Sequence, residues 1–101
     1  MVISFMVKEA REQLEKHKIV YTLRPYLRSK IMGFDWYNHF RGDTKKGNVY
    51  ILFVDNFLNR DNELEKYVFR SGFNSLEDWL KKAKGSRFLY EVFIVDKNRK
   101  V

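Results

Sequence analysis

The sequence predicts an α+β fold, in which a small closed or partly closed β-barrel has two or three helices packed on one side. Segments with the alternation of strands are interleaved with segments of helical spacing. Two strands, Asn48–Asp55 and Arg87–Val95, carry apolar residues on both faces, which is typical of strands covered on both sides. Closing the sheet would also remove the edges that these strands would otherwise expose. The 101 residues, 45% of them hydrophobic, are enough for one domain over residues 1–101 with a modest core.

The first part of the chain predicts a strand, a helix and a second strand. Val2–Val7 is rich in the β-branched and aromatic side chains that strands favour. Ala10 and Leu14 then follow at helical spacing, with opposite charges four residues apart on the other face. Ile19–Leu23 returns to a strand pattern, which Pro25 ends because proline pushes the preceding residue into an extended conformation.

The middle of the chain is less regular. Residues 24–33 predict a basic loop, and Asp35–Arg41 fits either one helical turn or a strand with aromatic packing. Gly42–Gly47 is polar and predicts a hairpin turn. Asn48–Asp55 is the clearest strand in the sequence, and Asp61–Phe69 predicts a short helix.

Ser75 predicts the start of another helix. Its hydroxyl can accept a hydrogen bond from the backbone N–H of Asp78, whose carboxylate can reach back as in a capping box. An apolar stripe follows on one face: Leu76, Trp79, Leu80 and Ala83. We expect Trp79 to lie in the core. Gly85 stands where a left-handed residue commonly ends a helix, and Arg87–Val95 is the last predicted strand.

Positive charge is concentrated in one stretch of the chain. The formal net charge is +7, and residues 16–46 alone carry eight basic side chains against two acidic ones. Aromatic side chains are interleaved with them: Tyr21, Tyr26, Phe34, Trp36, Tyr37 and Phe40. Clustered cations attract a polyanion, and aromatic rings offer surfaces on which unpaired bases stack. The stretch predicts a nucleic-acid-binding module, with RNA as the expected partner and single-stranded DNA as the second.

Eight residues are predicted nucleic-acid contacts. They are Arg24, Arg28, Lys30, Trp36, Tyr37, Arg41, Lys45 and Lys46. Arg24 and Arg28 flank a proline-stiffened loop, where a guanidinium can bind a phosphate through two hydrogen bonds. The alternative for Arg24 is an internal ion pair with a carboxylate such as Glu91. Trp36 and Tyr37 would point to opposite faces of a strand, so one should be core and the other could stack on a base. The remaining cations either widen the patch or are simply solvated.

Four segments also keep a recognisable order and spacing. Ile3–Arg24 is a strand, a helix and a strand, and Gly47–Ile51 is a strand opened by glycine. Ser71–Leu80 is an acidic and aromatic helix start, and Leu89–Val92 lies in the final strand. Together they resemble ASCH-domain proteins, which are small relatives of the RNA-binding PUA domain. The resemblance implies a PUA-like β-barrel, with a cleft lined by the second strand and by the loop before the capped helix.

The sequence departs from the catalytic pattern of that family. Some ASCH proteins are amidohydrolases that act on acetylated cytidine with a lysine, a threonine and a glutamate. Thr22 stands at the threonine position, but the lysine position falls on Ile19 and the glutamate position falls near Ser71 or Gly72. The usual glycine-containing turn before the second strand is replaced by Lys16–Ile19. The resemblance therefore does not carry that activity to this chain.

Two other classes of function stay open. One is a small hydrolase that acts on a modified nucleoside or on RNA in a polar cleft. Its catalytic candidates are Lys18, Thr22, Ser71 and Tyr90. This reading lacks an evident general base of suitable pKa within reach. The other is a protein–protein adaptor whose basic surface meets an acidic partner.

Composition narrows the remaining classes. The chain has no cysteine, so disulfides, thiolate nucleophiles and cysteine-based zinc sites are excluded. No carboxylate spacing around His17 or His39 suggests a metal site, and we expect neither a metal nor a cofactor. The apolar opening segment 1–7 is too short for a membrane span or a signal peptide. We therefore expect a cytoplasmic protein that does not insert into membranes.

Overall fold

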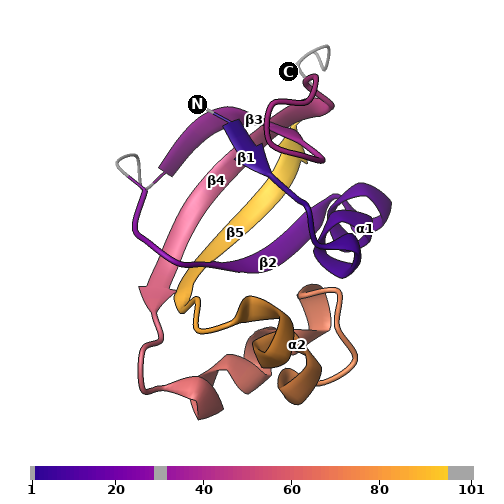
Figure 1. The fold of residues 1–101 in the computed structure, drawn as a ribbon. Coiled ribbons are helices and arrows are strands. Elements are labelled where there is room, and N and C mark those ends of the chain that lie inside the picture. Colours follow the sequence, from indigo (N-terminus) through magenta and orange to yellow (C-terminus); the bar gives the residue numbers. More distant parts are fainter. Residues whose placement is uncertain (1, 29–31, 96–101) are drawn as a thin grey trace.

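A computed structural model of the chain describes residues 2–28 and 32–95. It contains five strands, two α-helices and one 3-10 helix (Figure 1). In chain order these are β1 (Val2–Ser4), α1 (Lys8–His17), β2 (Ile19–Arg24), β3 (Met32–Asn38), β4 (Gly47–Asn56), η1 (Asp61–Arg70), α2 (Leu76–Ala83) and β5 (Phe88–Val95).

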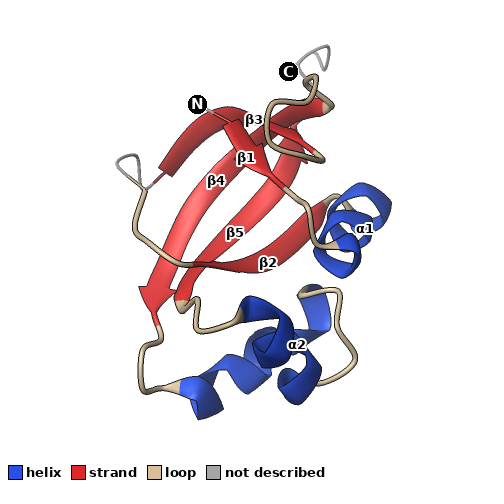
Figure 2. Ribbon diagram, viewed as in Figure 1, coloured by secondary structure: helices blue, strands red, loops and turns tan. Residues whose placement is uncertain are grey.

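The five strands form one curled sheet in the order β1-β3-β4-β5-β2. The pairing of β1 with β3 is parallel, whereas the other three pairings are antiparallel. Strands β1 and β2 are the two edges, so the sheet is an open half-barrel. Figure 2 shows the helices gathered at one side and one end of the strands. The predicted α+β class with a barrel-like sheet is confirmed.

Each face of the sheet has its own core. The inner face packs against α1 through a cluster that includes Leu14, Val20, Tyr37, Val49 and Val92. The outer face is covered at one end by η1 and α2. Its cluster consists of Leu23, Phe57, Leu64, Trp79 and Leu89. Strands β2, β4 and β5 therefore carry apolar residues on both sides, which the sequence predicts for β4 and β5.

The ends of α2 follow the predicted pattern with two differences, the first of which is that no described hydrogen bond links the Asp78 carboxylate back to the Ser75 backbone as a capping box requires. The Ser75 hydroxyl accepts a hydrogen bond from the backbone N–H of Asp78 at 3.2 Å, which caps the helix. Trp79 is 3% exposed and lies in the core, as predicted. The left-handed C-cap is Lys84, with φ 51°, and Gly85 follows it with φ 90°. The helix thus ends one residue earlier than the glycine indicates.

In three segments the structure decides or corrects what the sequence predicts. The ambiguous segment 35–41 is largely strand, because β3 pairs with both β1 and β4. The first strand ends at Ser4 and not at Val7, since Met6 and Val7 form an exposed connection into α1. Residues 61–70 form a 3-10 helix in which only Leu64 is buried. One buried side chain gives little tertiary packing with which to stabilise a regular α-helix.

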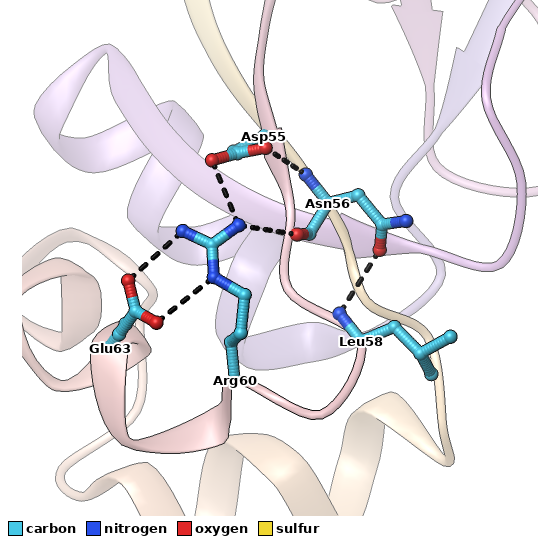
Figure 3. Close-up of polar contacts among 5 residues, drawn as sticks. All are labelled: Asp55, Asn56, Leu58, Arg60 and Glu63. Atoms are coloured by element: carbon cyan, nitrogen blue, oxygen red, sulfur yellow. Dashed lines mark hydrogen bonds and ion pairs between the residues drawn. The ribbon is translucent and has the colours of Figure 1, made fainter.

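A network around Arg60 fixes the junction between β4 and η1 (Figure 3). The guanidinium donates to both carboxylate oxygens of Glu63, at 2.9 and 3.0 Å. It also donates to Asp55 at 3.1 Å and to the backbone oxygen of Asn56 at 3.0 Å. The Asn56 side chain accepts from the backbone N–H of Leu58 at 3.0 Å. The turn out of β4 is therefore held by a single side chain with four acceptors.

Among the described helices, none is both long enough and apolar enough to cross a lipid bilayer.

Candidate functional site

A pocket lies where the ends of β1 and β2 approach α2. Its volume is about 190 Å³. The chain between β1 and α1 forms one wall, β2 forms the second, and residues on either side of and within α2 form the third. The polar side chains in its lining are Ser4, Thr22, Arg24, Lys82 and Ser86. The apolar part includes Phe5, Met6, Phe73 and Trp79. The pocket is therefore mixed in polarity, with two cationic side chains in its lining.

Arg24 spans the open seam between the two edge strands. Its Nη1 donates to the backbone oxygen of Ser4 on β1 at 2.9 Å, and its guanidinium lies 4.9 Å from the ring centre of Phe5. Its Nε is enclosed and has no hydrogen-bond partner. Among the described residues, no carboxylate forms an ion pair with Arg24. The predicted alternative of an ion pair with Glu91 is therefore wrong.

Burial makes the positive charge of Arg24 energetically unfavourable. Burial, and then the positive charge of Arg28, lower the pKa of Arg24 to about 10. A buried charge without a counter-charge is unfavourable by several kcal/mol, and an anion in the pocket would relieve that cost. Nε has no acceptor among the described residues, so this buried donor is unsatisfied.

Arg28 is in a different situation. Its Nη2 lies 2.9 Å from Oδ2 of Asp35, and both side chains are largely buried, at 11% and 4% exposure. Its backbone N–H donates to the hydroxyl of Tyr90 at 2.7 Å. The two residues predicted as one pair of phosphate contacts are thus unlike each other. Arg28 has a carboxylate partner, whereas Arg24 has none among residues 2–28 and 32–95.

Trp36 and Tyr37 point to opposite faces of β3, as expected. Tyr37 is the core residue, at 4% exposure, and its hydroxyl donates to Glu15 at 3.0 Å. Burial, together with that carboxylate, raises the pKa of Tyr37 to about 12. Trp36 is half-buried on the outer face. Of the two rings, Trp36 is the one placed where a base could stack.

The loop between β3 and β4 carries three of the predicted cations. Arg41, Lys45 and Lys46 are all exposed there, and none of them forms an ion pair with a described residue. They do not line the pocket, so the predicted contacts occupy more than one location. Lys30 lies outside the described residues.

The four catalytic candidates do not meet at one site. Thr22 lines the pocket, and Tyr90 lies opposite it on β5 but is fully buried. Ser71 is buried in the turn after η1, where its hydroxyl donates to the backbone oxygen of Val68 at 2.8 Å. Lys18 is the exposed C-cap of α1 and does not line the pocket. The described lining of the pocket contains no aspartate, glutamate or histidine.

Lys82 is a pocket residue that the sequence does not predict, whereas Phe73 lies in the loop before the capped helix, where the resemblance implies a cleft. Both lie far along the chain from the basic stretch and reach the pocket only because η1 and α2 fold back against β2. Lys82 is one of several lysines at the end of α2, and nothing local distinguishes it from Lys81. The apolar stripe of α2 predicts that the helix packs against the sheet. It does not predict what the polar side chains beside the stripe contact.

Glu15 joins α1 to β3 through a second polar cluster. Its Oε2 lies 2.6 Å from Nε2 of His39 and accepts the hydroxyl of Tyr37. Burial raises the pKa of Glu15, but the hydrogen bonds from His39 and Tyr37 outweigh it, so the pKa is lowered overall. Within the described ranges, no three side chains of the metal-binding types gather into a possible metal site.

We expect Glu15→Gln to weaken the acid dependence of stability. Because the carboxyl of Glu15 has a lowered pKa in the folded protein, its stabilisation is present above the ordinary glutamate pKa and is lost as pH falls through the lowered value. Urea unfolding from pH 7 to about pH 3 measures this as a shallower fall for the variant. Glu12→Gln, on the exposed face of the same helix, is the control. A fall as steep as that of the unaltered protein would contradict the assignment.

Comparison with protein-family models, with curated proteins and with solved structures gave no significant match to this chain. The class of the protein is thus described by its own fold and site. It is an α+β protein with a curled five-stranded sheet and a cationic pocket at the open seam of that sheet.

Proposed function

We propose that this protein binds RNA, and single-stranded DNA more weakly, with a backbone phosphate seated in the Arg24 pocket. The observation that carries the proposal is Arg24, a cationic side chain that lines a pocket of about 190 Å³ and has no carboxylate partner among the described residues. A phosphate oxygen accepts charge-assisted hydrogen bonds of the kind that a guanidinium offers. The PUA-like resemblance agrees with this ligand.

The rest of the pocket suits the same ligand. Lys82 adds a second positive charge from α2. Thr22 and Ser86 are hydroxyl-bearing residues of the lining, and such groups can hydrogen-bond the ribose 2′-hydroxyl that distinguishes RNA from DNA. The Ser4 hydroxyl already donates to Asn38. The exposed cations of the β3–β4 loop would contact neighbouring phosphates, which places the sequence-predicted Arg41, Lys45 and Lys46 at the edge of the interface.

The test is a salt titration of binding to a labelled single-stranded RNA of about 10 nucleotides. We expect Arg24→Met to weaken binding by about ten-fold or more, as the loss of a charge-assisted hydrogen bond does. The slope of log K against log salt should fall by about 0.7, the counterion release of one phosphate contact on a single strand. Arg24→Lys keeps the charge but not the forked donors of the guanidinium. Its affinity for RNA should therefore lie between that of the unaltered protein and that of Arg24→Met.

Lys82→Met and Lys81→Met form the matched control pair on α2. Lys82 lines the pocket and Lys81 does not, although the two are adjacent and both exposed. Only Lys82→Met should weaken binding. Because neither residue packs in the core, this pair also keeps the test valid if Arg24→Met fails to fold. Unchanged affinity and salt slope in both Arg24→Met and Lys82→Met would overturn the proposal.

Two further arms identify the ligand. A DNA strand of the same sequence should bind more weakly, since it lacks the 2′-hydroxyl. Inorganic phosphate should compete only at concentrations far above those of the RNA, because it makes one of several phosphate contacts. If phosphate competed at the same concentration as RNA, the pocket would be a site for the free anion and the RNA proposal would be wrong.

A further inference from the structure

Part of the outer face of the sheet is covered by no described element of the chain. At one end of this face, η1 and α2 cover Leu23 and Leu89. At the other end, no residue of these helices packs on the side chains of β3, β4 and β5. We call this area the open outer face. It consists of Met32, Phe34, Trp36, Tyr50, Leu52 and Phe93. Met32 and Phe34 are 53% and 67% exposed, which is unusual for large apolar side chains in a sheet.

Three rings run across the open outer face in register. Phe34 pairs with Tyr50, and Tyr50 pairs with Phe93, on three neighbouring strands. The ring centres of Phe34 and Tyr50 are 5.0 Å apart with the planes at 85°, and those of Tyr50 and Phe93 are 5.5 Å apart with the planes at 25°. Strand spacing of about 4.8 Å thus holds the rings in a continuous row. Trp36 lies two residues along β3 from Phe34, on the same face.

Charge beside the row identifies what would bind there. The backbone N–H of Lys46 donates to Tyr37 at 2.8 Å, continuing the β3–β4 pairing by one residue. Alternation along β4 then puts the Lys46 side chain on the same face as Tyr50. Lys45 and Arg41 lie in the same loop, and none of the three has an ion-pair partner among the described residues. A second copy of the chain would bring these like charges together, whereas a polyanion would neutralise them.

We infer that the open outer face is a stacking surface for the unpaired bases of a single-stranded nucleic acid, with Lys46 and its loop at the phosphates. This inference rests on the proposed function, but it concerns a separate surface, since the face shares no lining residue with the Arg24 pocket. Base–aromatic stacking is tolerant of sequence, because every base presents a flat face. The contact therefore adds affinity for unpaired strands without selecting a sequence.

The experiment compares variants of Phe34 with a single-stranded RNA of about 12 nucleotides, within the site sizes of such surfaces. We expect Phe34→Ala to raise Kd about five-fold or more while the salt slope stays unchanged, because a ring contacts a base and not a phosphate. Phe34→Tyr should keep the affinity. Phe34→Leu, which is apolar but not aromatic, should lose it. Binding to the corresponding RNA duplex should be the same for all variants, since paired bases cannot stack on the rings.

Phe69→Ala is the matched control. Phe69 is 68% exposed, almost the same as Phe34, but it lies on η1 beside Tyr21. It should bind RNA as the unaltered protein does. The stacking surface would be wrong if Phe69→Ala and Phe34→Ala lost the same affinity for RNA. It would also be wrong if Phe34→Leu kept the full affinity. Sedimentation gives a further test. A dimer of the unaltered protein that persists with RNA but is lost in Phe34→Ala would also overturn the stacking surface, because the face would then be a dimer interface.

The two proposals fail in different ways. If Arg24→Met weakens binding and Phe34→Ala does not, the RNA function stands and the stacking surface is wrong. If the unaltered protein binds no single strand even at low salt, the proposed function is wrong and the inference falls with it.

Discussion

Replacing Trp79 with alanine is expected to lower the free energy of unfolding by about 3–5 kcal/mol, the range of large aromatic truncations in cores. Trp79 is 3% exposed and packs in the outer cluster with Leu23, Leu64 and Leu89. Its removal would leave a cavity between α2 and the sheet that neighbouring side chains can fill only in part. Urea unfolding monitored by circular dichroism measures the loss.

Trp79→Phe and Leu58→Ala calibrate that result. The first keeps most of the buried ring volume and should cost clearly less than alanine. The second removes a side chain that is 61% exposed and should change stability by no more than about 0.5 kcal/mol. A loss below about 1 kcal/mol for Trp79→Ala would mean that α2 does not depend on this contact. The packing described for the outer cluster would then be incorrect.

Gly72→Ala is expected to destabilise the protein by about 2–6 kcal/mol, because backbone strain and overpacking each contribute about 1–3 kcal/mol. Gly72 has a backbone φ of 90°, which residues other than glycine rarely adopt. A Cβ there would lie 2.2 Å from the backbone oxygen of Glu9, in the first turn of α1. Backbone atoms cannot swing aside as the end of a side chain can, so the turn before α2 would have to move away from α1.

Gly85→Ala separates the two causes. Gly85 also has φ 90°, but no atom lies within 4 Å of its added Cβ. It should therefore lose only the strain, about 1–2 kcal/mol. If the two glycine variants were equally destabilised, the close approach of Gly72 to Glu9 would be absent in solution. Gly72 also precedes Phe73, so its variant should distort the pocket and weaken RNA binding more than Gly85→Ala does.

Much of the fold could be predicted because it is encoded in local patterns. The apolar alternation of Asn48–Asp55 predicts a strand covered on both faces, and β4 is indeed the central strand of the sheet, between β3 and β5. Ser75 predicts the start of α2, and in the structure its side chain caps the helix by accepting from the backbone N–H of Asp78. In both cases a rule that acts over a few residues agrees with the tertiary contacts.

The candidate site was harder to predict because it depends on distant contacts. The partner of Arg28 is Asp35, seven residues away, and that of Arg24 is the backbone of Ser4, twenty residues away on the other edge strand. Sequence spacing treats the two arginines alike and cannot tell which one has a counter-charge. It likewise could not decide which of Trp36 and Tyr37 is core, because that depends on which face of β3 meets α1.

The position of β5 in the sheet has a consequence for how the chain folds. This strand is the last in sequence, yet it lies between β4 and β2. Strand β2 therefore has no partner in the sheet until residues 88–95 have been synthesised. Of the strand pairings among the described residues, β3–β4 is the only one closed by a single loop, because η1 and α2 lie between β4 and β5. Contacts so distant in sequence slow folding, since large loops must close before the pairing is gained. On the ribosome, β2 would gain its partner strand, and the pocket beside it would be completed, only after β5 has emerged from the exit tunnel.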